Sequence, residues 1–317
     1  MSALHGSETQ FEYTTIERLK QIGYRHLFGP EIERAKETVV LTGALRDALA
    51  RRYPDLPAAA LDDAMQRLSR PQGVDTLRRN LTFHHELLTR GFELPVESAD
   101  GRKEHRHIHP IDWSNPANND FVVVNQLPIS GKNDRRPDLI IYVNGLPLVV
   151  FELKNPYAEK PTVDDAWNQL QHYAVDIPQL FEFNALCVVS DGSASLHGMW
   201  SAPREWFAPW KSIDGFQIEP GTTGSMKTLI EGLFAKERLL SYVRDFIVFE
   251  VDSRGVAKKG AKYHQFFAVR LRISMLITGS LCIMPSGSKM RRFTATANGS
   301  TESASTSKPI ATNAMLL

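Results

Sequence analysis

RPDLIIYVNGLPLVVFELKNP, residues 136–156, is the stretch that decides the predicted fold. Two apolar runs flank Asn144-Gly145, a pair that tolerates the positive φ angles of a tight turn and therefore predicts a β-hairpin. The second run is apolar on both faces, which is typical of a strand in the interior of a sheet. Glu152 and Lys154 share one face near the end of that run, because side chains two residues apart lie on the same side of a strand.

The register of this hairpin decides whether Asp138 lies beside Glu152. A two-residue turn would place Asp138 on the opposite face of the hairpin from Glu152. A three-residue loop, Asn144–Leu146 with a bulge at Gly145, pairs the two carboxylates instead. Pro147 cannot donate a ladder hydrogen bond, which disfavours a regular tight hairpin. We therefore predict the longer, bulged loop with both carboxylates on one face.

The charged side chains of the hairpin suit phosphodiester hydrolysis. Asp138 and Glu152 would repel each other without a cation, and Mg²⁺ accepts oxygen ligands from a few carboxylates together with water. Lys154 cannot ligate a metal while charged, but it can orient an attacking water or offset charge that grows on a phosphate. An ordinary Glu152–Lys154 salt bridge at the end of a strand is the alternative interpretation of this spacing.

The flanking segments predict a sheet that is covered by helices. Residues 121–129 and 185–192 have the apolar pattern of strands, and residues 162–177 carry apolar side chains at the spacing of an amphipathic helix. Strands and helices in this order predict an α/β fold. The N-terminal region is predicted to be helical, in the segments 14–24, 30–52, 57–70 and 74–92.

Composition narrows the class of protein without naming a function. The 317 residues are 42% hydrophobic and 23% charged, which is ordinary for a globular protein. The net charge of +1 requires any contact with nucleic acid to come from local patches. Cys187 and Cys282 have no metal-ligand spacing and fit a reducing cytoplasm. No apolar run approaches the ~20 residues that span a bilayer, so no membrane association is predicted.

Two short motifs outside the hairpin resemble metal-binding and nucleotide-binding patterns. In EHRHIHP, His105, His107 and His109 would share one face of a strand and could bind zinc, but no second ligand pair accompanies them. We therefore predict a solvated strand or loop there. GTTGSMKT, residues 221–228, has Met226 where a phosphate-binding loop needs glycine, so no ATP site is predicted.

Pro137-Asp138 followed by Glu152-Leu153-Lys154 is similar to the PD-(D/E)xK signature of restriction-endonuclease-like nucleases. RRPDLIIYVNGLPLVVFELKNP followed by DDAWNQLQHY more specifically resembles the N-terminal nuclease domain of the restriction subunit of type I restriction–modification enzymes. Gln169 and Tyr173, on one helical face, match the QxxxY element of this family and its RecB-like relatives. The resemblance covers most of residues 10–270.

The resemblance implies a restriction-endonuclease-like mixed sheet that is flanked by helices, after a helical N-terminal region. It also implies a role for each matching residue. Asp138 and Glu152 would bind Mg²⁺, and Lys154 would assist the attacking water. Gln169 and Tyr173 would support the site or contact the DNA backbone.

Three more residues and the partners follow from the same resemblance. Glu17, on the first predicted helix, is a candidate upstream acidic member of the site. Arg135 and Arg136 lie beside the site in sequence and would contact the DNA backbone. Double-stranded DNA would be the substrate, and the methyltransferase and specificity subunits of the type I complex would be the partners, with the specificity subunit choosing the target sequence.

The resemblance also implies the domain organisation. We expect a flexible N-terminus at residues 1–10, the nuclease domain at 11–260, the start of an ATP-driven motor at 261–270, and an atypical, disordered tail at 271–317. In full-length members the position of Gln265 contacts adenine. Because no phosphate-binding loop follows it, we expect a product that is truncated before the motor.

Two other functions stay open. The chain could be a catalytically silent fragment that only docks to the methyltransferase core, or a stand-alone RecB-like nuclease. The motor-like segment around Gln265 argues against the stand-alone nuclease.

Overall fold

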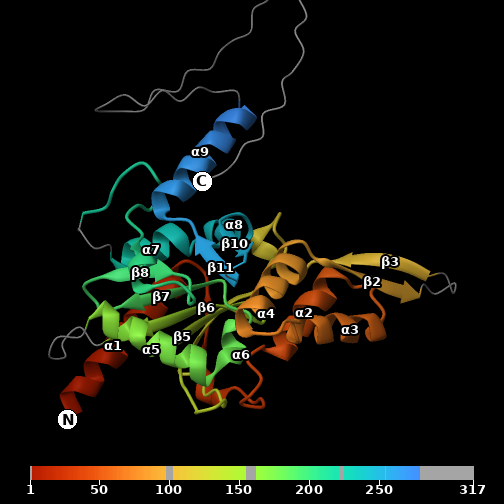
Figure 1. Ribbon diagram of the computed structural model, residues 1–317, viewed down its shortest axis with the longest axis horizontal. Helices are drawn as coiled ribbons and strands as arrows, with labels where there is room; N and C mark the ends of the chain where they lie inside the picture. The colour runs from red at the N-terminus through yellow and green to blue at the C-terminus, as the bar shows by residue number, and fades with distance from the viewer. Residues whose placement is uncertain (1, 98–102, 155–161, 221–224, 254, 279–317) are drawn as a thin grey trace, which may run out of the picture. The chain divides into compact units, whose positions relative to one another are not determined.

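A mixed β-sheet forms the centre of the fold (Figure 1). The computed structural model describes residues 2–97, 103–154, 162–220, 225–253 and 255–278, and divides the chain into residues 1–268 and 269–317. The fold described below is that of the first unit. Its central sheet has seven strands in the order β1-β4-β5-β6-β7-β8-β9. These strands are β1 (Arg25–Phe28), β4 (Phe121–Asn125), β5 (Leu139–Val143), β6 (Leu146–Leu153), β7 (Leu186–Ser190), β8 (Ser195–Gly198) and β9 (Ala208–Pro209).

Both parallel and antiparallel neighbours occur in this sheet. β1 pairs with β4 and β6 pairs with β7 in parallel, whereas the other neighbouring pairs are antiparallel. Helices lie on both sides of the sheet (Figure 1). The helices are α1 (Ser2–Gln21), α2 (Thr42–Arg52), α3 (Ala58–Ser69), α4 (Thr76–Thr82), α5 (Val163–Asp176), α6 (Pro178–Phe181), α7 (Met226–Leu233), α8 (Lys236–Asp245) and α9 (Tyr263–Thr278). The predicted α/β, restriction-endonuclease-like class is confirmed.

The central strands owe their position to continuous burial. Every residue of β5, β6 and β7 is buried, and α5 packs against both β6 and β7. A strand that is covered on both faces needs apolar side chains on both faces, which explains the unbroken runs in its sequence. The prediction that residues 146–153 form an interior strand is confirmed.

The turn between β5 and β6 differs from the prediction. Val143 pairs with Leu146, so Asn144 and Gly145 alone form a two-residue turn, with φ angles of 51° and 80°. Positive φ at both central residues is the geometry of the tight hairpin turn that Asn-Gly favours. The predicted three-residue loop is wrong, because the local preference of Asn-Gly outweighs the missing donor of Pro147.

A bulge inside β6 restores the register that the longer loop was expected to produce. Tyr142 pairs with Pro147, but Ile141 pairs with Val149, so Leu148 is an extra residue in its strand. Beyond this bulge the pairing shifts by one residue, and Leu139 lies opposite Phe151. The same register continued by one residue would place the position of Asp138 opposite that of Glu152.

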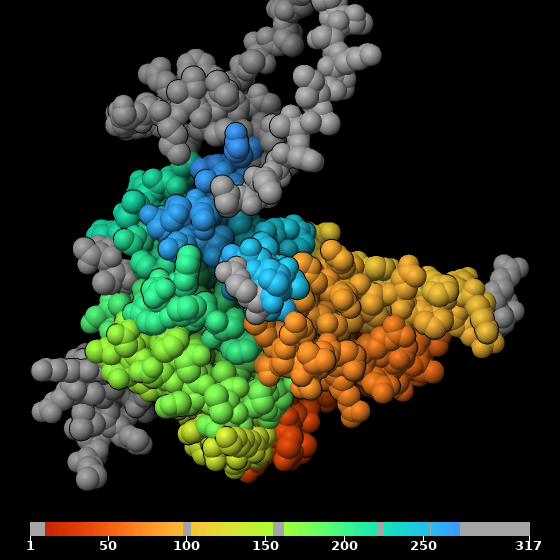
Figure 2. All heavy atoms as spheres, viewed as in Figure 1, coloured from red at the N-terminus to blue at the C-terminus, as the bar shows by residue number. Residues whose placement is uncertain are grey.

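Two small hairpins flank the central sheet. β2 (Phe92–Glu97) pairs with β3 (Lys103–Ile108), and β10 (Ile247–Asp252) pairs with β11 (Gly255–Gly260). The β2–β3 hairpin lies alongside α3 (Figure 2). Lys258 of β11 is buried, and its Nζ donates to the carbonyl of Asn184, two residues before β7, at 2.5 Å. This bond ties the β10–β11 hairpin to the central sheet.

Several segments differ from the sequence prediction. Residues 30–52 were expected to be one helix, but helix α2 begins only at Thr42. β1 and β2 were not predicted as strands, whereas β3 contains most of EHRHIHP, for which a strand or loop was predicted. The chain is helical from Ser2, where a flexible segment of residues 1–10 was predicted. Residues 271–278 of the predicted tail continue α9, and the rest of the tail lies outside the described residues.

Candidate active site

The end of the β5–β6 hairpin brings Asp138, Glu152 and Lys154 together. The Nζ atom of Lys154 lies 2.7 Å from Oε1 of Glu152, which is only 3% exposed. Oδ2 of Asp138 accepts a hydrogen bond of 2.7 Å from the backbone N–H of Leu153, the residue between the other two. The backbone N–H of Lys154 donates to the carbonyl of Ser190 in β7 at 2.8 Å, which holds this end of the strand within the sheet.

Helix α5 adds the two polar side chains of the QxxxY element to this site. The helix begins with a capping box, in which Thr162 and Asp165 satisfy each other's backbone N–H groups. The hydroxyl of Tyr173 interacts with the side chains of Glu152 and Gln169. Burial, together with the negative charges of Glu152 and Asp138, raises the pKa of Tyr173 far above its usual value. The hydroxyl therefore stays protonated and can donate to Glu152.

Helix α1 contributes Glu12 to the site instead of the predicted Glu17. Glu17 lies on the exposed side of the helix and pairs with Lys20 at 2.7 Å. Glu12 is 7% exposed, and its Oε2 accepts a hydrogen bond of 2.8 Å from Gln126, whose Nε2 also lies 3.3 Å from Oδ1 of Asp138. Glu12 lies four residues before the buried Ile16, so its place on the apolar face of the predicted helix was the available signal.

Arg135 and Arg136, the predicted DNA contacts, differ in their surroundings. The guanidinium of Arg135 donates to Oδ2 of Asp176, at the end of α5, from Nε at 2.7 Å. Hydrogen bonds from Asn133 and Arg135 lower the pKa of Asp176. Arg135 thus links the segment before Asp138 to the helix that carries Tyr173, whereas Arg136 is exposed.

The donor set at the hairpin end fits Mg²⁺. Among the described residues, no group of three or more histidine, cysteine, aspartate or glutamate side chains could hold a metal. A two-carboxylate site is nonetheless the arrangement that Mg²⁺ commonly uses, because it retains water and takes its other ligands from phosphate oxygens. Asp138 and Glu152 would hold such an ion, and the buried Glu152 carboxylate favours a cation beside it.

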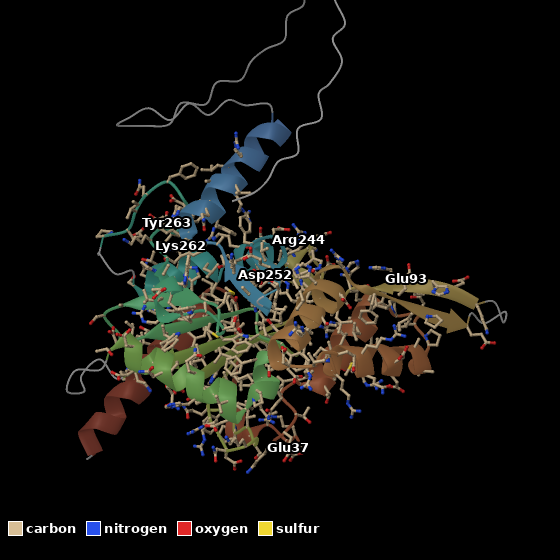
Figure 3. All side chains as sticks on the ribbon, viewed as in Figure 1. Glu37, Glu93, Arg244, Asp252, Lys262 and Tyr263 are labelled. Atoms are coloured by element: carbon tan, nitrogen blue, oxygen red, sulfur yellow. The ribbon has the colours of Figure 1, made fainter. Side chains whose placement is uncertain are left out.

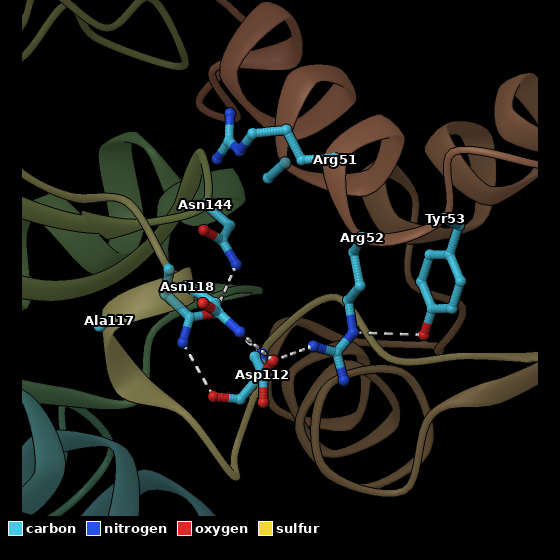
Figure 4. Close-up of a pocket in the computed structure, with 9 residues that line it drawn as sticks. Arg51, Arg52, Tyr53, Asp112, Ala117, Asn118 and Asn144 are labelled. Atoms are coloured by element: carbon cyan, nitrogen blue, oxygen red, sulfur yellow. Dashed lines mark hydrogen bonds and ion pairs between the residues drawn. The ribbon is translucent and has the colours of Figure 1, made fainter.

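A polar pocket of about 600 Å³ lies at the other end of the hairpin (Figure 4). Asn144 of the turn, Arg52 and Asp112 line it. Burial would raise the pKa of Asp112, but hydrogen bonds from Asn118, the backbone of Asn115 and Arg52 lower it to about 2. Asp112 and Arg52 form an ion pair of 2.7 Å in this pocket. Because the pocket lies at the turn, it is distinct from the site at Asp138.

The remaining candidate residues lie outside the site formed by Asp138, Glu152 and Lys154. His105 and His107 lie on β3, and the rings of His107 and His109 are 4.6 Å apart. Gln265 is exposed in the first turn of α9. Figure 3 labels Lys262 and Tyr263 at the start of this helix. The side-chain oxygen of Gln265 accepts a hydrogen bond of 2.8 Å from the backbone N–H of Lys262, so it caps the start of that helix.

The sheet and the side chains at the end of its central hairpin define a restriction-endonuclease-like protein. Residues 7–206 match the family of the type I restriction enzyme R protein N terminus, and the chain belongs to this family. The chain is 35% identical over 284 residues to the type I restriction enzyme HindI endonuclease subunit of Haemophilus influenzae. That match covers 86% of this chain and 27% of the relative.

Two further relatives carry the same kind of name. The type I restriction enzyme EcoprrI endonuclease subunit of Escherichia coli is 28% identical over 160 residues, which cover 48% of each chain. The type I restriction enzyme SauCOLORF180P endonuclease subunit of Staphylococcus aureus is 26% identical over 189 residues, 59% of this chain and 18% of the relative. The chain thus spans just over a quarter of the HindI subunit.

None of the described helices is long and apolar enough to cross a membrane.

Proposed function

We propose that this chain is the DNA-cleaving region of a type I restriction endonuclease subunit and that it hydrolyses phosphodiester bonds with Mg²⁺. The observation that carries the proposal is the ammonium group of Lys154 beside two carboxylates at the end of the hairpin. Lys154 lies 2.7 Å from the buried carboxylate of Glu152, and Asp138 is bonded to the residue between them. Two acidic groups and one ammonium group are the set that phosphate hydrolysis needs.

Each side chain has a role in the proposed reaction, in which water attacks a backbone phosphorus in line with the leaving oxygen. Glu152 positions the ammonium group of Lys154, which orients the water or offsets charge that grows on the phosphate. Tyr173 supports Glu152 from the side of α5, and Gln169 interacts with Tyr173. A bound Mg²⁺ would activate water and neutralise charge as a Lewis acid.

The substrate and partners belong to the same proposal. Double-stranded DNA is the proposed substrate, and the exposed Arg136 is the proposed backbone contact beside the site. Methyltransferase and specificity subunits are the proposed partners in a cytoplasmic type I complex. The proposed adenine contact at Gln265 concerns the full-length relatives.

The decisive experiment compares two lysine–glutamate ion pairs that have the same N···O distance of 2.7 Å. Purified chain is incubated with plasmid DNA and Mg²⁺, alone and with the partner subunits. Lys154→Ala is expected to lower the cleavage rate by about 10²–10³-fold, since it removes the charge beside the phosphate. Lys227→Ala is the matched control, because Lys227 pairs with Glu231 at 2.7 Å on the surface of α7.

Three results are informative. Cleavage that is lost in Lys154→Ala and kept in Lys227→Ala supports the proposal. Equal rates in both variants would place the chemistry elsewhere in the chain. Absence of cleavage by the wild-type chain under all of these conditions would favour a silent fragment that only docks to the methyltransferase core.

A further inference from the structure

The backbone next to the candidate site is strained at one residue. Gln126 directly follows β4 and has a φ of 52°, in the left-handed region. Residues with a Cβ atom seldom adopt this conformation, and it persists only where the surrounding structure imposes it. Strained residues of this kind cluster at functional sites, so the contacts of Gln126 are informative.

The strain allows two consecutive side chains to reach one carboxylate. Nδ2 of Asn125 donates to Oε1 of Glu12 at 2.7 Å, and Nε2 of Gln126 donates to Oε2 at 2.8 Å. In an extended strand, consecutive side chains point to opposite faces and could not meet the same group. The left-handed conformation of Gln126 ends the strand and lets both amides converge on Glu12.

Gln126 also contacts Asp138 through both its backbone and its side chain. Its N–H donates to the carbonyl of Asp138 at 3.0 Å, and its Nε2 lies 3.3 Å from Oδ1. Leu153 donates to the other oxygen, Oδ2, at 2.7 Å. Each oxygen of the Asp138 carboxylate thus has a protein donor, and the two donors together fix the orientation of the carboxylate.

An amide is the group that can perform this task. A side-chain NH₂ has two hydrogens, so it can donate one to each of two carboxylates. Gln126 can therefore hold Glu12 and Asp138 near each other while both remain charged. An ionised carboxylate in its place could only accept hydrogen bonds and could not join the two acidic groups.

We propose that Gln126 is a positioning residue, whose amide links Asp138 to Glu12 and sets the orientation in which Asp138 meets the divalent cation. The inference rests on the proposed function, because the cation belongs to that proposal. Its distinctive claim is that the strained backbone serves the site and not the stability of the fold.

The test separates binding from folding. Binding of Mn²⁺, used in place of Mg²⁺, is measured on the full chain by electron paramagnetic resonance, and stability is measured by urea unfolding. Gln126→Gly is expected to unfold at the wild-type urea concentration or above it, since glycine adopts positive φ freely. It is expected to bind Mn²⁺ more weakly by about ten-fold or more, because one hydrogen bond to a charged group is lost.

Two further variants complete the design. Gln126→Asn tolerates the left-handed backbone but is one methylene shorter, and it is expected to weaken Mn²⁺ binding as glycine does. Gln171→Ala is the matched control, because it removes an amide of α5 that donates to the carbonyl of Trp200 at 3.0 Å. This control is expected to bind Mn²⁺ with wild-type affinity.

The failures of the two proposals are distinguishable. Wild-type Mn²⁺ affinity in Gln126→Gly, together with DNA cleavage by the wild-type chain, would overturn the positioning role and leave the nuclease proposal intact. If the wild-type chain neither binds Mn²⁺ nor cleaves DNA with its partner subunits, the nuclease proposal and this inference fail together.

Discussion

Glu152 is a carboxylate with 3% of its surface exposed, at the end of a strand whose other residues are apolar. Burying a charged group costs several kcal/mol, on the order of 3–5, unless partners compensate for the lost water. Lys154, directly after the same strand, hydrogen-bonds to it, and Tyr173 of α5 interacts with it. Each partner therefore affects both the stability of the fold and the charge available at the site.

Tyr173→Phe should lower DNA cleavage by about ten-fold, because Glu152 loses a donor worth ~1.5 kcal/mol. The measurement is the rate of plasmid cleavage at saturating Mg²⁺, together with urea unfolding. Tyr242→Phe is the control, since it also removes a buried hydroxyl, which donates to the carbonyl of Ala261 at 2.8 Å. Both variants should lose similar stability, and equal cleavage by the two would contradict a role for the Tyr173 hydroxyl.

At the scale of the elements, the β5–β6 turn determines where the strands can pair. Gly145 has a φ of 80°, and a Cβ atom there would lie 2.6 Å from the carbonyl oxygen of Leu41. The carbonyl of Gly145 accepts a hydrogen bond of 2.9 Å from Leu41, directly before α2. The turn is therefore restricted to glycine by its backbone angle and by the close approach of α2.

Gly145→Ala should destabilise the fold by about 2 kcal/mol or more, the sum of a left-handed backbone and a backbone clash. Gly43 in α2 is the matched control, because a Cβ atom there meets nothing within 4 Å. Gly43→Ala should stabilise the fold by ~0.5–1 kcal/mol, since alanine favours the helix. Urea unfolding measures both, and destabilisation of equal size would show that the turn is not special.

At the scale of the whole molecule, one buried lysine joins elements that are distant in sequence. Lys258 of β11 donates to the carbonyl of Asn184, which also accepts a hydrogen bond of 2.9 Å from Asn80 in α4. Burial lowers the pKa of Lys258 to about 7, and nearby His84 has its pKa lowered to about 3 by burial and by the charge of Lys258. The interior at this junction thus favours neutral groups.

Raising the pH from 7.5 to 8.5 should stabilise the wild-type protein through Lys258 by about 1 kcal/mol. Between the folded pKa of about 7 and the unfolded value near 10.4, the unfolded chain binds more protons, so stability rises with pH. In Lys258→Met, the rise of the unfolding free energy with pH that comes from Lys258 should be absent. The carbonyl of Asn184 keeps its hydrogen bond from Asn80 in this variant. Urea unfolding of both proteins at the two pH values tests this, and parallel slopes would contradict it.

The pattern of the sequence predicts those elements whose burial is regular. The hairpin and helix α5 are clear, because apolar side chains alternate with the period of each element. β1 is short and mostly exposed, so it leaves no apolar pattern. Val39 and Val40 are buried without being helical, which extended the predicted helix too far.

The candidate site was predictable only as far as its residues are close in sequence. Asp138, Glu152 and Lys154 share a hairpin, and Tyr173 lies on the next helix. Glu12 and Gln126 come from elements whose approach depends on the sheet order and on one backbone angle. No periodicity encodes either of these, so the sequence alone does not decide between Glu12 and Glu17 as the acidic residue of the first helix.

The hydrogen bonds from Asn125 and Gln126 to Glu12 span 113 and 114 residues of chain. Ribosomes add about 5–20 residues per second, so on the order of ten seconds separates the synthesis of α1 from that of its amide partners. During that interval the first helix emerges without the groups that later bind its carboxylate. The complete constellation of side chains therefore arises only after the chain has been synthesised as far as Tyr173, and shorter nascent chains cannot contain it.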